Sequence, residues 1–199
     1  MKNKFTLLGI LCLIGFTFAS CTSTEEKKNS TISNQTDSIV SQPQVSTGVQ
    51  MLENKLIQDS LNIELRAILA ANYYSAGELT KAAYHYLIIS GQNHKNIDAL
   101  KNLGNIYYDS HEDDKAIQFY ERALQIEPEN INMKCDLATC YSRINKLKKA
   151  TEILRSNIKA DPKHAQSHHN LSVILDQSGQ KKEAAEEMKI YKEITEGKK

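Results

Sequence analysis

The feature that most restricts the fold of this chain is a repeat with a period of 34 residues, the spacing between Leu69 and Leu103. One column of the repeat is always leucine, at Leu69, Leu103, Leu137 and Leu171. A second column is always alanine, at Ala82, Ala116, Ala150 and Ala184. An ordinary helix bundle predicts heptad spacing of apolar residues but no period of this length. The period therefore indicates a row of equivalent structural units.

Each repeat contains the apolar pattern of two short helices. In the repeat at 97–130, two stripes with helical spacing consist of Leu100, Leu103 and Tyr107, then of Tyr120, Ala123 and Leu124. Gly104 and Ala116 are small, which allows the two helices to approach closely. Pro128 follows the second stripe, where the helix must end because proline cannot continue it. The pattern predicts a helical hairpin in each repeat.

The leucine, glycine, tyrosine, alanine and proline positions of this repeat resemble the tetratricopeptide repeat (TPR), a helix–turn–helix unit of about 34 residues. Only the first aromatic residue of the family pattern differs, since Leu100 stands in its place. The resemblance implies an all-α fold, a right-handed α-solenoid of about four TPR hairpins. The hairpins are expected at 63–96, 97–130, 131–164 and 165–198, after a lead-in helix at 52–62. The polar outer face of the last predicted helix suits it to serve as the C-terminal cap.

The beginning of the chain predicts export and membrane attachment. Two lysines precede an apolar run at 5–18, which is too short for a membrane span and has the layout of a secretory signal. The motif Phe-Ala-Ser-Cys that ends at Cys21 resembles the lipobox of bacterial lipoproteins, although leucine is usual at the position of Phe18. The resemblance implies that a signal peptide at 1–20 is removed and that Cys21 is lipidated. Plain secretion, with cleavage close to the same point, is the alternative.

Residues 21–51 are predicted to be the lipidated Cys21 followed by a disordered tether. The segment is rich in Ser, Thr, Asn, Gln and Lys and has almost no apolar residues, so it cannot bury enough surface to fold. Thr22 follows Cys21 where lipoproteins retained in the inner membrane have an aspartate. The resemblance therefore implies a lipid-anchored location in the bacterial cell envelope, at the outer membrane.

Charge and motifs argue against a nucleic-acid binder and against an enzyme. The 25 Lys+Arg and 24 Asp+Glu nearly balance, so the chain lacks the basic excess of a nucleic-acid-binding protein. It has no Gly-rich phosphate loop, no G-x-S-x-G and no HExxH motif, so we expect no enzyme activity and no cofactor. His164 and His168 have i, i+4 spacing and could share a metal ion, but no nearby carboxylate or thiolate completes a ligand set.

Beyond Cys21, the chain has two cysteines, Cys135 and Cys140. Five residues apart on one helix, their Cα atoms would be about 8.6 Å apart, beyond the limit of about 7 Å for a disulfide. We expect both to stay unpaired, with Cys140 in the core and Cys135 on the inner face of the solenoid.

The resemblance also implies a concave face, lined by the first helix of each hairpin, that binds an extended peptide or a helix. The candidate partner-binding residues on this face are Tyr74, Lys101, Asn105, Tyr108, Asn132 and His169. Tyr74 and Tyr108 are the preferred anchors, because rigid aromatic residues with a polar tip dominate interface energies. The alternative, that both tyrosines only fill the joint between repeats, stays open.

One known TPR binding mode, the grip on a C-terminal carboxylate, does not fit this chain. Lys101 and Asn105 match two of its five positions, but Asp136, Gln166 and Asn170 occupy the others. An aspartate facing a carboxylate would repel it.

Taken together, these features predict a membrane-tethered TPR scaffold that binds a protein or peptide partner in the bacterial cell envelope. Assistance in the assembly of envelope or pilus complexes is one form of this role. The alternatives are a carbohydrate- or cell-wall-binding lipoprotein, against which the absence of tryptophan argues, and a structural role through self-association.

Overall fold

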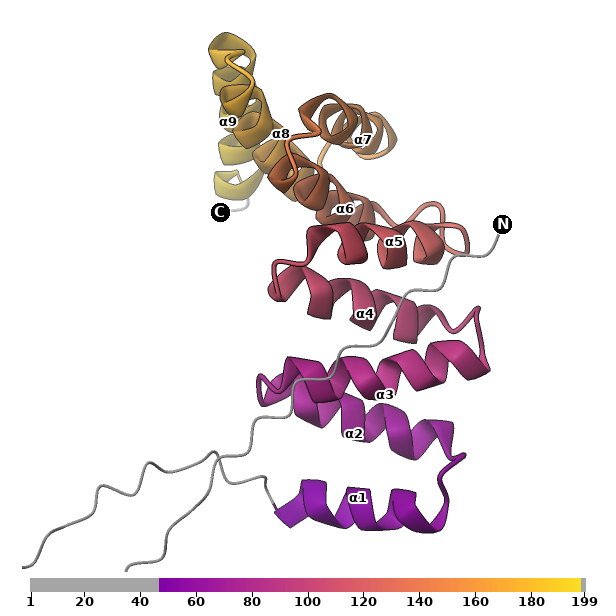
Figure 1. The fold of residues 1–199 in the computed structure, drawn as a ribbon. Helices are drawn as coiled ribbons and strands as arrows, with labels where there is room; N and C mark the ends of the chain where they lie inside the picture. The colour runs from indigo at the N-terminus through magenta and orange to yellow at the C-terminus, as the bar shows by residue number, and fades with distance from the viewer. Residues whose placement is uncertain (1–46, 198–199) are drawn as a thin grey trace, which may run out of the picture. The chain divides into compact units, whose positions relative to one another are not determined.

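The structure, a computed structural model, describes residues 47–197. The described residues form nine helices and no strand, which confirms the all-α prediction (Figure 1). The helices are α1 (Thr47–Gln58), α2 (Ile63–Ser75), α3 (Leu79–Gln92), α4 (Ile97–Asp109), α5 (Asp113–Leu124), α6 (Ile131–Arg143), α7 (Leu147–Ala160), α8 (Ala165–Gln177) and α9 (Lys181–Glu196). The predicted signal peptide and Cys21 lie outside the described residues, as does most of the predicted tether. Within 47–197, no helix has the length and hydropathy that a membrane crossing requires.

The helices pair as successive hairpins that stack side by side along the chain. The hairpins α2–α3, α4–α5, α6–α7 and α8–α9 have the most extensive helix–helix contacts, and each second helix also packs against the first helix of the next hairpin (Figure 1). The first helices begin at Ile63, Ile97, Ile131 and Ala165, which are 34 residues apart. This arrangement is the predicted α-solenoid of four hairpins.

Polar residues with the same period set the ends of the helices. The first helices are N-capped by the side chains of Asn62, Asn96, Asn130 and His164, each of which accepts a hydrogen bond from the backbone three residues later. The turn inside each hairpin contains one residue with positive φ, at Gly77, His111, Asn145 and Gly179. The capping residues and the turn residues are not apolar, so a search for hydrophobic periodicity does not reveal these two repeating positions.

The core consists of the apolar columns that the sequence repeats. The four leucines of the all-leucine column have exposed fractions between 0% and 5%. Gly104 on α4 faces the ring of Tyr120 on α5, and a Cβ atom at residue 104 would lie 2.5 Å from a ring carbon. The small residue at this position therefore sets the distance between the helices, as expected.

The lead-in helix differs in position from the prediction of 52–62, because α1 is Thr47–Gln58. Val49 is buried at 6% exposure, which extends the packed helix into the range assigned to the tether. Tyr73 donates a hydrogen bond to Glu53 of α1, just as Tyr141 donates to Glu121 of α5 at the same spacing along the chain. Helix α1 thus occupies the place of the second helix of a preceding repeat and covers the N-terminal side of α2.

Candidate partner-binding face

The first helices of neighbouring hairpins contact one another directly and form one surface, which we call the first-helix face. Between α2 and α4, the hydroxyl of Tyr74 donates to Asp109 Oδ2 at 2.5 Å. Between α4 and α6, Arg143 donates to the carbonyl oxygen of Tyr108 at 3.3 Å. Between α6 and α8, Ser142 Oγ donates to Gln177 Oε1 at 2.7 Å. The first-helix face is therefore continuous over α2, α4, α6 and α8.

Tyr74 and Tyr108, the preferred anchors, are both half-buried where neighbouring hairpins join. Burial and the hydrogen bond to Asp109 raise the pKa of Tyr74 to about 12, so its hydroxyl stays protonated as a donor. The ring of Tyr108 is covered by the guanidinium of Arg143, 4.6 Å from the ring centroid, and Arg143 also pairs with Asp113 at 3.2 Å. Both tyrosines thus connect adjacent hairpins, and their contact with a partner stays a prediction.

Lys101 and Asn105 lie in the middle of α4 and have unused hydrogen-bonding groups. Lys101 is half-buried and has no ion-pair partner among the described residues. Asn105 Oδ1 accepts a hydrogen bond from the Tyr120 hydroxyl at 2.9 Å, which orients the amide and leaves its NH₂ group as a donor. The ammonium group of Lys101 and the NH₂ group of Asn105 are therefore available to donate hydrogen bonds to a partner.

Asn132 and His169 lie on α6 and α8 and contact other parts of the chain. Asn132 Oδ1 lies 3.0 Å from His164 Nε2, which donates to it. His169 packs against the ring of Tyr191 on α9, with centroids 5.0 Å apart. The structure therefore separates the six candidates into a group on α2 and α4 and these two residues further along the solenoid.

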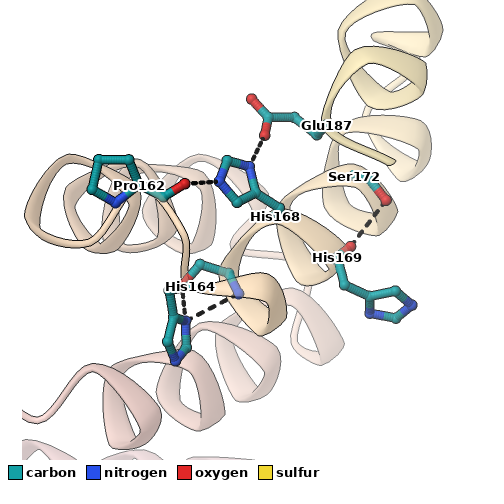
Figure 2. A network of polar contacts seen from close by, with 7 residues as sticks. Pro162, His164, His168, His169, Ser172 and Glu187 are labelled. Carbon is teal, nitrogen blue, oxygen red and sulfur yellow. Dashed lines mark hydrogen bonds and ion pairs between the residues drawn. The ribbon is translucent and has the colours of Figure 1, made fainter. Parts of the chain in front are cut away.

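The three neighbouring histidines have three different environments (Figure 2). His164 Nδ1 accepts from the backbone and hydroxyl of Ser167 and caps α8. His168 is buried, with Nδ1 2.6 Å from Glu187 Oε2 and Nε2 3.1 Å from the carbonyl oxygen of Pro162. Both ring nitrogens of His168 are thus within hydrogen-bonding distance of oxygen atoms from other parts of the chain. No group of three metal-ligating side chains is present among residues 47–197.

The contact between His168 and Glu187 could not be found from apolar spacing, but the repeat contains a signal for it. In the first hairpin, Arg66 and His85 occupy the same two columns, and their side chains lie 3.2 Å apart. The second hairpin has Leu100 and Phe119 in these columns. Polar pairs thus occupy these two columns in the first and last hairpins, in place of the apolar pair of the second.

Cys135 is not on the first-helix face, which corrects the prediction. It is 1% exposed, and its Sγ lies 3.2 Å from Ser167 Oγ and 3.5 Å from Asn157 Nδ2. His164 Nδ1 is 4.0 Å from the thiol but is occupied by Ser167, and burial raises the pKa of Cys135. A buried, protonated thiol is not a nucleophile. Cys140 is buried in the core as expected, and neither cysteine is in a disulfide.

Asp136 on α6 stands out in the sequence only as a mismatch to the carboxylate grip, but the structure gives it an unusual environment. Its side chain is solvent-accessible, yet desolvation by the surrounding protein raises its pKa to about 6. It makes no ion pair or side-chain hydrogen bond within 47–197. Its charge also contributes to raising the pKa of Tyr120, the residue that orients Asn105.

Comparison with known proteins identifies relatives of this helical array. Residues 100–197 match the family model of the fourth ARM domain of tetratricopeptide repeat protein 21. Over 111 residues, 54% of the chain, the sequence is 26% identical to the Protein CTR9 homolog of Arabidopsis thaliana. The chain spans about a tenth of the length of that relative, since the match covers 10% of it.

Solved structures of MamA are similar to the described helices. One crystal structure of MamA gives a TM-score of 0.70 at 20% identity, covering 75% of this chain and 88% of MamA. MamA residues 41 to the end, from Desulfovibrio magneticus RS-1, give 0.71 at 15% identity, covering 75% of this chain and 85% of that one. At these identities the likeness shows the fold, a solenoid of helical hairpins.

Proposed function

We propose that this chain, whose helices form a solenoid of TPR-like hairpins, is a non-enzymatic scaffold that binds a protein or peptide partner on its first-helix face. The observation that supports this site is a pair of available polar groups in the middle of α4. There Lys101 has no partner within the described residues, and Asn105 is oriented by Tyr120 with its NH₂ donors unused. Oriented polar groups on a rigid helix lose little entropy when they bind.

The proposal includes attachment of the scaffold to a membrane of the bacterial cell envelope through a lipid on Cys21. Its support is the lipobox-like sequence alone, which lies outside the described residues. Cys21→Ser should move the protein from the membrane fraction to the soluble fraction and abolish incorporation of labelled palmitate. Unchanged fractionation and labelling would contradict the lipid anchor without affecting the partner-binding proposal.

Site-specific photo-cross-linking in cells tests the partner-binding face. A photoreactive amino acid at Lys101 or Asn105 should form an adduct with the same partner protein. The same amino acid at Gln118, an exposed residue of α5, is the matched control and should not form that adduct. Equal adducts at all three positions, or none at the two positions on α4, would overturn the proposal.

A further inference from the structure

Two joints of the solenoid contain the same cluster of three side chains, and the joint between them contains only part of it. In each complete cluster, a tyrosine hydroxyl on a first helix donates a hydrogen bond to a glutamate on the helix before it. A lysine ammonium lies over the ring of the same tyrosine, 5.1 Å from the centroid in one cluster and 4.1 Å in the other. The complete clusters are Tyr73, Lys81 and Glu53, then Tyr141, Lys149 and Glu121.

The joint between α3 and α4 has the tyrosine and the lysine of this cluster but not the glutamate. Lys115 Nζ lies 5.0 Å from the centroid of the Tyr107 ring, and Leu87 stands in the column of the glutamates. The Tyr107 hydroxyl has no hydrogen-bond partner within residues 47–197. Tyr107 is half-buried, whereas Tyr73 and Tyr141 are 3% and 2% exposed. The position of an acceptor beside Tyr107 is therefore open.

The acidic neighbour of Lys115 does not replace the absent glutamate. Glu112 pairs with the Lys115 ammonium at 2.5 Å and makes no hydrogen bond with Tyr107. The first cluster has the same kind of pair, because Lys81 lies 3.4 Å from Glu78, and the tyrosine there still donates to its own glutamate. A further carboxylate beside the Tyr107 hydroxyl is thus compatible with the pair already present.

Next to Tyr107, α3 exposes two large apolar side chains. Tyr84 is 60% exposed and Leu87 is 41% exposed. Together with Ala83, Ile106 and Tyr107 they line a groove of about 330 Å³, which we call the α3 groove. In the later second helices, the same two columns hold polar or charged residues: Gln118, Glu152 and Glu186, then Glu121, Arg155 and Lys189. The apolar surface is therefore particular to α3 and is not a property of the repeat.

We propose that the α3 groove binds a segment of a partner protein in which an acidic side chain lies next to a large apolar one. The acidic side chain accepts the hydrogen bond of the Tyr107 hydroxyl beside the Lys115 ammonium, in the place that the glutamates occupy in the complete clusters. The apolar side chain covers Tyr84 and Leu87 and removes their exposed surface from water. This second binding surface goes beyond the proposed function and does not depend on it.

Binding of defined fluorescent peptides to the full-length protein, measured by fluorescence anisotropy, tests the inference. The probes are a peptide that repeats Leu-Glu-Ser, a twin that repeats Leu-Gln-Ser and a twin that repeats Ala-Glu-Ser. The first twin lacks the carboxylate and the second lacks the large apolar side chain. Each twin should bind wild type about tenfold more weakly than the Leu-Glu-Ser peptide.

Two substitutions in the groove should weaken binding of the Leu-Glu-Ser peptide. Tyr107→Phe removes only the hydroxyl and should lower the affinity about tenfold, the expected effect of losing one hydrogen bond to a charged group. Leu87→Glu supplies the absent carboxylate from the chain itself and should prevent binding. Tyr141→Phe is the matched control, because its carboxylate partner is already Glu121, and it should bind the peptide like wild type.

Three results would show that the inference is wrong. The first is that the Leu-Glu-Ser peptide does not bind wild type, or binds no more tightly than its twins. The second is equal affinity of wild type, Tyr107→Phe and Leu87→Glu, in variants whose circular dichroism shows the same helix content. The third is an equal loss of affinity in Tyr107→Phe and Tyr141→Phe. Partner adducts at Lys101 and Asn105 test the first-helix face separately and would stand in each case.

Discussion

The contact between Gly104 and Tyr120 leads to a sharp prediction about stability: Gly104→Ala should destabilise the protein. The added methyl carbon would lie 2.5 and 2.6 Å from two ring carbons of Tyr120, far inside van der Waals contact. The ring has little freedom to move away, because Tyr120 is 2% exposed and its hydroxyl is bonded to Asn105 at 2.9 Å.

Two opposing terms set the size of the effect. Overpacking of a core costs about 1–3 kcal/mol, whereas alanine gains about 0.8–1.0 kcal/mol over glycine in a helix interior. Because the ring of Tyr120 is buried and its hydroxyl is hydrogen-bonded, we expect the cost of overpacking to lie in the upper half of this range. The net loss in the free energy of unfolding should then be about 1–2 kcal/mol.

Urea denaturation followed by far-UV circular dichroism measures this loss, with Gly91→Ala as the matched control. Gly91 lies on α3, and a Cβ atom there would meet nothing within 4 Å, so alanine should leave stability unchanged or raise it by up to about 1 kcal/mol. Combining Gly104→Ala with Tyr120→Leu should cost less than the sum of the two single changes. If Gly104→Ala is as stable as wild type, the packing argument is wrong.

Three further predictions concern the core, the terminal hairpin and the first-helix face. Leu103→Ala should lower the free energy of unfolding by about 2–5 kcal/mol, because Leu103 is 0% exposed; a loss below about 0.5 kcal/mol in urea denaturation would contradict its place in the core. Glu187→Ala should cost about 1.5–3 kcal/mol by leaving buried His168 without its carboxylate, and the double change His168→Leu with Glu187→Phe, the pair of the second hairpin, should recover most of that loss. The folded-state pKa of Asp136 is raised from 3.8 to about 6, so its ionisation opposes folding above about pH 6 and has no effect below about pH 4. Asp136→Asn should therefore be more stable than wild type at neutral pH but not below about pH 4, and an equal gain at both would refute the desolvated carboxylate as its cause.

The solenoid could be predicted from the sequence because its core is local and periodic. Leu103 and its equivalents are buried in every repeat, and each hairpin packs mainly against its neighbours, so one pattern of apolar columns specifies one unit of structure. The caps repeat as well, at Asn62, Asn96 and Asn130, and comparing polar columns would have revealed them.

The chemistry of the candidate site depends on contacts between repeats, which the period alone does not specify. Lys101 and Cys135 occupy the same column, yet only Cys135 is buried, because Ser167 and His164 at the start of α8 cover it. Asp136 likewise gains its raised pKa from the protein around it. The repeating apolar columns of the sequence by themselves determined the fold, since burial repeats with the period. Which polar side chains stay available for a partner was decided only by the tertiary structure, since solvation and hydrogen bonding depend on neighbours from other helices.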